Sequence, residues 1–144
     1  MVRVSAAEAE LTKQKIIDSA FEITMCEGFE SLTFTKLSNH CGVSRSGINR
    51  HFPKKNDILK VLEPRVEKIL KAQMNFASPT EFYESWVEGL ANNPEFRSAI
   101  LAAGPIIPTD KGIRNLKRLI KGNDDEVIKC IYMCIGYAVV NLNK

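Results

Sequence analysis

The chain has 144 residues, of which 44% are hydrophobic, and its formal net charge is +3 at pH 7. This length and composition favour one compact domain, or a small module joined to a helical body. No apolar run approaches the ~20 residues of a membrane span, and the N-terminus lacks the apolar core of a secretion signal. We therefore expect a cytoplasmic protein with no membrane partner.

The cysteines do not form a metal-binding pattern. Cys26, Cys41, Cys130 and Cys134 lack CxxC spacing and nearby histidines, so we predict no metal site and no cofactor. We favour small core residues in a reducing compartment over the alternative of a redox switch. No acid pair, nucleophile–base pairing or phosphate loop is visible, and we predict that the chain is not an enzyme.

Apolar residues recur at helical spacing in the first third of the chain. They predict a helix over about residues 11–27 after a polar, frayed start. Gly28 should end this helix, and Phe29 should return to the core. Thr33 is a suitable N-cap for a second helix that extends to about residue 40. A third helix is expected over about residues 44–52.

The remaining residues also predict helices. A fourth should begin near residue 55, and Pro64 should kink or split it because proline removes a backbone N–H and clashes with the preceding turn. Two more should follow Ser78-Pro79 and Asn93-Pro94. Residues 104–108 are expected to form a loop, and further helices to cover residues 111–121 and 124–142. Nothing reads as a strand, so the predicted fold class is all-α.

Residues 32–55 have the pattern of a helix-turn-helix, a motif that docks into the DNA major groove. Gly42 suits the positive φ that ends the first helix. Ser44 suits the N-cap of the second helix, because its hydroxyl can accept a backbone N–H. That helix carries side-chain types that contact bases and phosphates: Arg45, Ser46, Asn49 and Arg50.

Positive charge is concentrated on this unit. Residues 36–60 contain six basic residues and one acidic residue, whereas residues 61–144 contain eleven basic and ten acidic residues. Such an uneven distribution is what electrostatic contact with DNA requires.

The pattern over residues 13–62 resembles the TetR family of bacterial transcriptional regulators. The resemblance rests on the joint spacing of Ile16, Ile17, Ala20, Phe21, Gly28, Phe29, Thr33, Leu37, the 41–44 turn, the 51–53 junction, Lys55, Ile58 and Leu59. It implies a helix-turn-helix DNA-binding domain over residues 1–54 and a small helical ligand-binding and dimerisation domain over residues 55–144. It further implies a homodimeric repressor that a small-molecule effector releases from a palindromic operator in double-stranded DNA.

The resemblance also assigns residues to the DNA contact. By position, the base-facing residues are Arg45, Ser46 and Gly47, and the phosphate-facing residues are Thr33, Thr35, Asn49, His51 and Lys55. The full predicted DNA-binding set adds Lys36, Ser44, Arg50 and Lys54. Asn49 stands where the family usually has a tyrosine, and the open alternatives are a bidentate bond to adenine and a solvated side chain.

Two further sites are expected in the second domain. The candidates for an apolar effector pocket, with simple core packing as the alternative, are Phe82, Trp86, Phe96, Tyr132 and Tyr137. The last helix combines small and bulky residues, which favours a dimer contact over packing within the monomer. The predicted contact residues are Cys130, Met133, Cys134, Tyr137 and Ala138.

A basic stripe provides a second functional hypothesis. It consists of Lys111, Arg114, Lys117, Arg118 and Lys121 on one helix. A solvated face is favoured, and a surface for a membrane or an acidic partner is the alternative. In the second hypothesis the protein is a DNA-anchored architectural or protein-interaction factor without an effector, and this helix recruits its partner.

Overall fold

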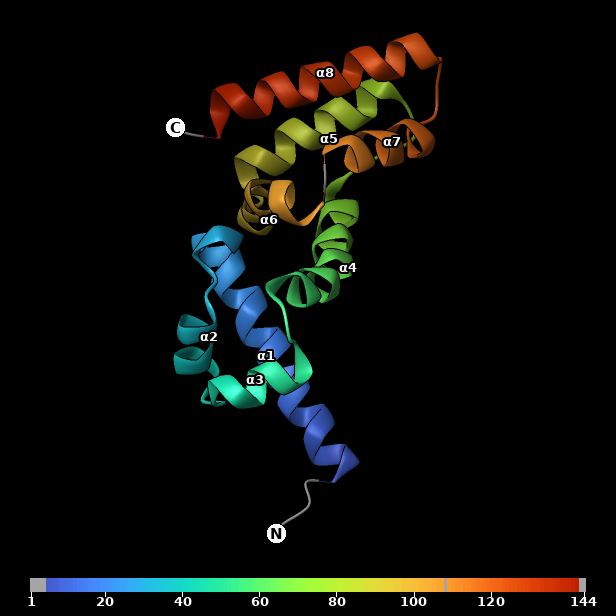
Figure 1. Cartoon of the computed structure of the whole chain (residues 1–144). Helices are drawn as coiled ribbons and strands as arrows, with labels where there is room; N and C mark the ends of the chain where they lie inside the picture. The colour runs from blue at the N-terminus through green and yellow to red at the C-terminus, as the bar shows by residue number, and fades with distance from the viewer. Residues whose placement is uncertain (1–4, 108, 143–144) are drawn as a thin grey trace. The chain divides into compact units, whose positions relative to one another are not determined.

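The computed structural model describes residues 5–107 and 109–142, and all regular elements in these ranges are helical (Figure 1). The all-α prediction is therefore confirmed. In chain order the elements are α1 (Ala6–Glu27), the 3₁₀ turn η1 (Phe29–Ser31), α2 (Phe34–Cys41), α3 (Arg45–His51), α4 (Lys55–Gln73), α5 (Pro79–Asn92), α6 (Pro94–Ile106), α7 (Thr109–Leu119) and α8 (Asp124–Asn141). Among these described helices, none is long and apolar enough to cross a bilayer.

The chain forms two compact units, Met1–Arg65 and Val66–Lys144, which we call the head and the body. The division lies inside α4, whereas the predicted boundary lay between residues 54 and 55. The first part of α4 belongs to the head because Ile58 and Leu62 are buried there. Arg65 Nη1 also donates a hydrogen bond of 2.7 Å to Asp18 Oδ1 of α1, and its guanidinium lies 4.0 Å from the centroid of the Phe21 ring.

The head is built on α1, which packs against η1, α2 and α3. The core contains Ile16, Ala20, Leu37 and Ile48, all fully buried, and Phe29 also packs inside as predicted. The helix predicted from about residue 11 begins earlier, at Ala6, because Ser5 Oγ accepts the Glu8 N–H and caps it. Residues 1–4 of the predicted frayed start lie outside the described residues.

Prolines interrupt the helices less than the sequence suggested. Pro64 was predicted to kink or split the fourth helix; α4 continues through Pro64, so of these two outcomes the split was wrong. Pro64 and Lys60 are exposed, and the Lys60 carbonyl that loses its helical partner can therefore be hydrated. The predicted loop over residues 104–108 was also wrong for residues 104–106, which form the last turn of α6. Pro105 lies so near the helix end that little helix follows it; residue 108 lies outside the described residues.

The body is centred on α5, which packs against α6 and runs beside α8 (Figure 1). Its core contains Phe82, Phe96 and Ile131, all fully buried, with Trp86 beside them. Gly89 permits the close approach of α5 and α6, because a Cβ there would lie 2.5 Å from the Phe96 ring. This packing leaves one side of α8 inside the core and the other side in solvent.

Candidate nucleic-acid interface

The turn between α2 and α3 is held by local hydrogen bonds that the sequence predicts. Gly42 has a φ of 74° and donates its N–H to the Ser38 carbonyl, which ends α2. Ser44 Oγ accepts the Gly47 N–H at 3.1 Å and caps α3. Ser38 adds a bond that the sequence reasoning missed, because its hydroxyl donates to the Val43 carbonyl at 2.6 Å. These bonds fix where α3 begins relative to α2.

The recognition helix α3 is anchored by one buried side chain. Ile48 is 0% exposed, whereas Arg45, Asn49 and Arg50 are exposed on the rest of the helix. Within the described part of the chain, no hydrogen bond or ion pair engages the side chains of these three residues. Their donors are therefore available for a ligand outside the chain, and two of the three carry a positive charge.

Gly47 has a packing role that its predicted place among the base-facing residues did not include. A Cβ at this position would lie 2.9 Å from Val43 Cγ1 and 3.2 Å from Ser44 Oγ. A larger residue here would require the Val43 side chain to shift, so glycine suits the close approach of α3 to the turn. Ser46 is exposed, and its hydroxyl lies 3.2 Å from Ser44 Oγ.

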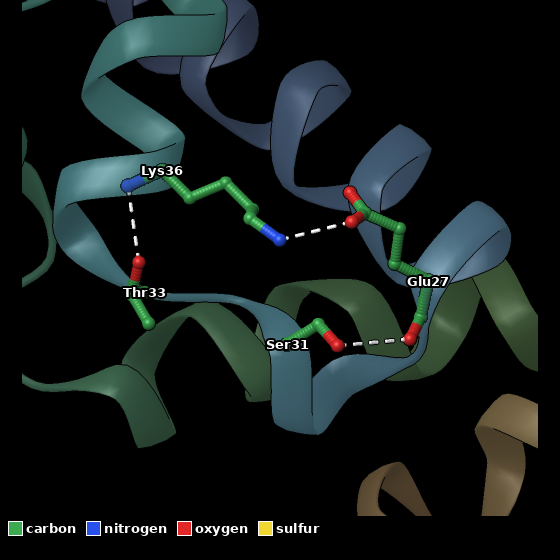
Figure 2. Close-up of polar contacts among 4 residues, drawn as sticks. All are labelled: Glu27, Ser31, Thr33 and Lys36. Atoms are coloured by element: carbon green, nitrogen blue, oxygen red, sulfur yellow. Dashed lines mark hydrogen bonds and ion pairs between the residues drawn. The ribbon is translucent and has the colours of Figure 1, made fainter.

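The start of α2 contributes further polar side chains to the surface of the head. Figure 2 shows Thr33 Oγ1 accepting the Lys36 N–H at 3.0 Å, which confirms Thr33 as the N-cap. It also shows Lys36 Nζ paired with Glu27 Oε1 at 2.9 Å. Ser31 Oγ donates to the Glu27 carbonyl and ties η1 to the end of α1. Both charged side chains are about half exposed, so a phosphate can compete with Glu27 for Lys36.

The start of α4 completes the polar surface of the head. Lys54 is exposed, and its backbone N–H donates to Asp57 Oδ2 at 2.9 Å, so Asp57 caps this helix. Lys55 is half-buried, with Nζ 4.6 Å from the centroid of the Phe29 ring. His51 is half-buried beside Phe52, and Thr35 is exposed. A helix N-terminus flanked by two lysines favours the binding of an anion.

The predicted DNA-binding residues thus all lie on the head, between η1 and the first turn of α4. The exposed ones are Thr33, Thr35, Ser44, Arg45, Ser46, Asn49, Arg50 and Lys54, and the half-buried ones are Lys36, Gly47, His51 and Lys55. Sequence reasoning missed Glu27 and Asp57, which hold Lys36 and the start of α4. The signal available for Asp57 was its place three residues after Lys54, the spacing of a capping box, whereas no local pattern links Glu27 to Lys36, nine residues away.

Comparison with known proteins identifies the head. Residues 16–62 match the family model described as bacterial regulatory proteins, tetR family. The head is a TetR-family DNA-binding domain. The HTH-type transcriptional regulator SrpR of Pseudomonas putida is 33% identical to this chain over 87 residues, which are 60% of this chain and 39% of SrpR. The uncharacterized HTH-type transcriptional regulator TtgW, also of Pseudomonas putida, is 32% identical over 87 residues, which are 60% of this chain and 63% of TtgW. The chain thus matches less than two thirds of either relative.

A solved structure extends the likeness to the body. The crystal structure of the multidrug binding protein EbrR complexed with imidazole has a TM-score of 0.70 and 12% sequence identity. The match covers 98% of this chain and 88% of the EbrR chain. At this identity the comparison establishes the fold, in which a TetR-type head is followed by a helical body.

The body contains a cavity of about 230 Å³. The end of α4 and helices α5 to α8 contribute to its lining, which is mainly apolar and includes Trp86, Ile100, Leu116 and Ile135. Of the predicted pocket residues only Trp86 lines this cavity. The others do not line it: Phe82 and Phe96 are fully buried core, as the alternative of core packing had it, Tyr137 packs against that core, and Tyr132 is 63% exposed.

The predicted dimer residues divide between the two sides of α8. Cys130, Cys134 and Ala138 are buried in the monomer because their four-residue spacing places them on one stripe of the helix facing the core. Tyr137 is half-buried, and Met133 alone of the set is well exposed. Burial raises the pKa of the Cys130 and Cys134 thiols, which keeps them protonated and unreactive.

After Lys129 the exposed side of α8 is mainly apolar. It carries five large hydrophobic side chains that are 40–68% exposed, and we call this surface the outer face of α8: Tyr132, Met133, Ile135, Val139 and Val140. Gly136 lies between them, and a Cβ there would have nothing within 4 Å. In residues 5–107 and 109–142, no group of His, Cys, Asp and Glu is arranged to hold a metal ion.

Proposed function

We propose that this protein is a cytoplasmic, sequence-specific transcriptional regulator that binds a palindromic operator as a homodimer. The observation that carries the proposal is the recognition helix: α3 is anchored by Ile48 and presents Arg45, Asn49 and Arg50, which have no side-chain partners among the described residues. Arginine and asparagine are the side chains that read guanine and adenine bidentately in the major groove. The caps at Ser44 and Thr33 set the helix ends without using these groups.

The outer face of α8 supports the dimer. A contiguous apolar surface of this kind is typical of a protein-binding site rather than of a free monomer surface. A second copy presents the same surface, so the contact would be two-fold symmetric. Two heads related in this way would match the two halves of an inverted repeat. We therefore place the dimer contact on the outer face of α8 and not on Cys130, Cys134 and Ala138, which were predicted from the sequence and face the core.

The cavity supports control by a small, apolar effector, which would release the regulator from DNA as a repressor. The lining has few polar groups, as ligand sites usually do. EbrR shares the fold, is named a multidrug binding protein and was solved with imidazole. An effector can act only if its affinity differs between the DNA-binding and DNA-free conformations of the dimer.

The proposal is tested by selecting bound duplexes from a random DNA library with the purified protein at physiological salt. We expect an inverted repeat, and we expect Arg45→Ala to lose affinity for it by about 10–100-fold. Arg118→Ala is the matched control, because it removes an exposed arginine from α7 in the body. Recovery of no consensus sequence, or equal losses in both variants, would contradict base reading by α3.

A second candidate function rests on the basic side of α7. Lys117, Arg118 and Lys121 are exposed and have no ion-pair partner in the described part of the chain. Arg114 instead pairs with Asp110 at 3.0 Å, and its hydrogen bond lowers the pKa of that carboxyl group. In this alternative the TetR-type head anchors the chain to DNA and α7 recruits an acidic protein. Three results together would favour this alternative. The protein would bind DNA in a salt-sensitive way without sequence preference, Arg118→Ala would no longer capture the partner, and no effector would change DNA binding.

A further inference from the structure

One side chain belongs to both the cavity and the outer face of α8. Ile135 lines the cavity together with Trp86 and Leu116, and it is 40% exposed. Tyr132 and Val139, three residues before and four after it, lie on the same side of α8. The cavity wall therefore reaches the edge of the surface proposed for the dimer contact.

We propose that a second copy of the chain, packed on the outer face of α8, completes the cavity wall at Ile135. A molecule bound in the cavity then stabilises the dimer, and dimerisation strengthens the binding of that molecule. This inference rests on the proposed function, which supplies the dimer and the effector role of the cavity. By reciprocity, any factor by which dimerisation tightens ligand binding is the factor by which the ligand tightens the dimer.

The occupant of the outer face is a second copy because of the chemistry of this surface. Residues 130–141 contain no charged side chain, and the exposed Lys129 lies one turn before Met133 at the end of this surface. A nucleic acid or a charged peptide would therefore find a complementary group only at this end. Gly136 lies among the bulky residues, and the space where its side chain would be is empty. Two copies of α8 can therefore cross closely at this point, with the bulky side chains of each packing beside the other helix.

A contact through one helix per subunit is small. Stable interfaces bury about 800 Å² on each partner, and one helix face with five large side chains lies near or below this size. We therefore expect a dimer that dissociates at accessible concentrations, so that a ligand can shift its population. A tight, ligand-insensitive dimer would need a larger surface.

The cavity also defines a suitable probe molecule. An apolar cavity of about 150 Å³ holds benzene, so 230 Å³ accommodates a benzene ring with a short substituent. The charged lining residues are Glu67, which is half-buried, and Lys71, which is exposed. Neither is a buried charge that would compensate a charged ligand, so an uncharged ring is favoured. Isopropylbenzene is the probe, and benzoate, with a similar shape and a negative charge, is its control.

The experiment measures probe affinity and dimerisation separately. Trp86 is the single tryptophan of the chain and lines the cavity, so its fluorescence reports occupancy. Sedimentation velocity gives the dimer dissociation constant. Val139→Asp places a charge on the outer face without changing a cavity residue, and Leu101→Asp makes the same change at an exposed position on α6.

We expect saturating isopropylbenzene to tighten the wild-type dimer by about 10-fold, and Val139→Asp to be monomeric and to bind the probe about 10-fold more weakly. Leu101→Asp should behave as wild type, and benzoate should have no effect. Wild-type protein diluted below its dimer dissociation constant should bind isopropylbenzene as weakly as Val139→Asp does. This measurement tests the proposal without any substitution.

Three results would overturn the proposal, and they are distinguishable. Equal probe affinity in monomer and dimer would remove the linkage and leave the dimeric regulator intact. A wild type that is monomeric at all concentrations would remove the proposed dimer together with the inference. A dimer that binds neither isopropylbenzene nor benzoate would remove the proposed role of the cavity.

Discussion

The recognition helix of the head and the last helix of the body use opposite patterns. Helix α3 buries one apolar side chain, Ile48, and exposes basic and amide side chains, whereas α8 buries its small residues and exposes bulky apolar ones. The first arrangement suits a charged, hydrated partner, and the second suits an apolar partner. One chain therefore carries two unlike surfaces, each on a separate compact unit.

The two surfaces also differ in how they are determined. The position of α3 depends on neighbours within about ten residues, through Gly42, Ser44 and Ser38. The outer face of α8 depends on which stripe packs against α5, which lies far away in the sequence. Substitutions should therefore affect the head through local bonds and the body through packing.

The largest effect should come from the body core. Phe96→Ala removes a fully buried ring that contacts the Trp86 ring edge-on, and we expect a loss of about 3–5 kcal/mol in the free energy of unfolding. Urea titration followed by Trp86 fluorescence measures it, with the exposed Leu101→Ala as control. The helical signal of the head should survive at urea concentrations that unfold this body, and coincident loss would contradict two separate cores.

The next effect separates the two interpretations of Asn49. If this side chain reads an adenine, Asn49→Ala should weaken operator binding by about 1–3 kcal/mol and abolish the preference for adenine at one position. The measurement compares wild type and variant on the selected operator and on a version with that base pair replaced. An unchanged preference would assign Asn49 to solvent.

A smaller effect is expected at the cap of the recognition helix. Ser44→Ala removes the acceptor for the Gly47 N–H and should cost about 1 kcal/mol of head stability. Ser46→Ala is the matched control, because its hydroxyl caps no helix end among the described residues. Thermal unfolding measures both, and equal changes would argue against the cap.

The pair of Lys36 and Glu27 should have an effect of under about 1 kcal/mol, because both groups are half exposed. Glu27→Gln removes a negative charge beside the predicted phosphate contact, so operator affinity should rise by a few-fold without a change in salt dependence. Lys36→Gln should lower the affinity and reduce the logarithmic salt slope by about one. Unchanged slopes in both variants would place Lys36 away from phosphate.

The smallest effect concerns pH. Hydrogen bonds from Arg65 and Gln14 hold the pKa of Asp18 below its ordinary value of 3.8. A lowered pKa in the folded protein stabilises the head above pH 3.8, and this contribution is lost as the pH falls through the folded value. Asp18→Asn should therefore lower the melting temperature slightly at neutral pH, and the difference should disappear in acid. A difference in melting temperature that grows as the pH falls would contradict a lowered pKa of Asp18 in the folded protein.

The sequence predicted the head more completely than the body. Helix caps, positive φ angles and helix ends depend on neighbouring residues, so the roles expected there are found. The residues concerned are Gly28, Phe29, Thr33, Gly42 and Ser44. Glu27 and Asp57 were missed because they act on the DNA-binding set through tertiary or capping contacts, not by matching its motif.

The body shows where local patterns are insufficient. The aromatic residues were grouped as a pocket by type, yet Phe82 and Phe96 fill the core and Tyr132 lies in solvent. The small residues of α8 were assigned to a partner helix, although Cys130 and Cys134 instead face the core of the same chain. A helix that is apolar on most sides does not reveal from sequence which side its own fold will cover.

The most direct test of the account is a hydroxyl-radical footprint of the protein on the selected operator, with wild type and Val139→Asp compared side by side. The account predicts two protected segments about 10 base pairs or a multiple of this apart for the wild type. Val139→Asp should lose both at the same protein concentration, because each isolated head binds weakly. A single protected segment for the wild type, or an unchanged footprint for the variant, would contradict two heads joined through the outer face of α8.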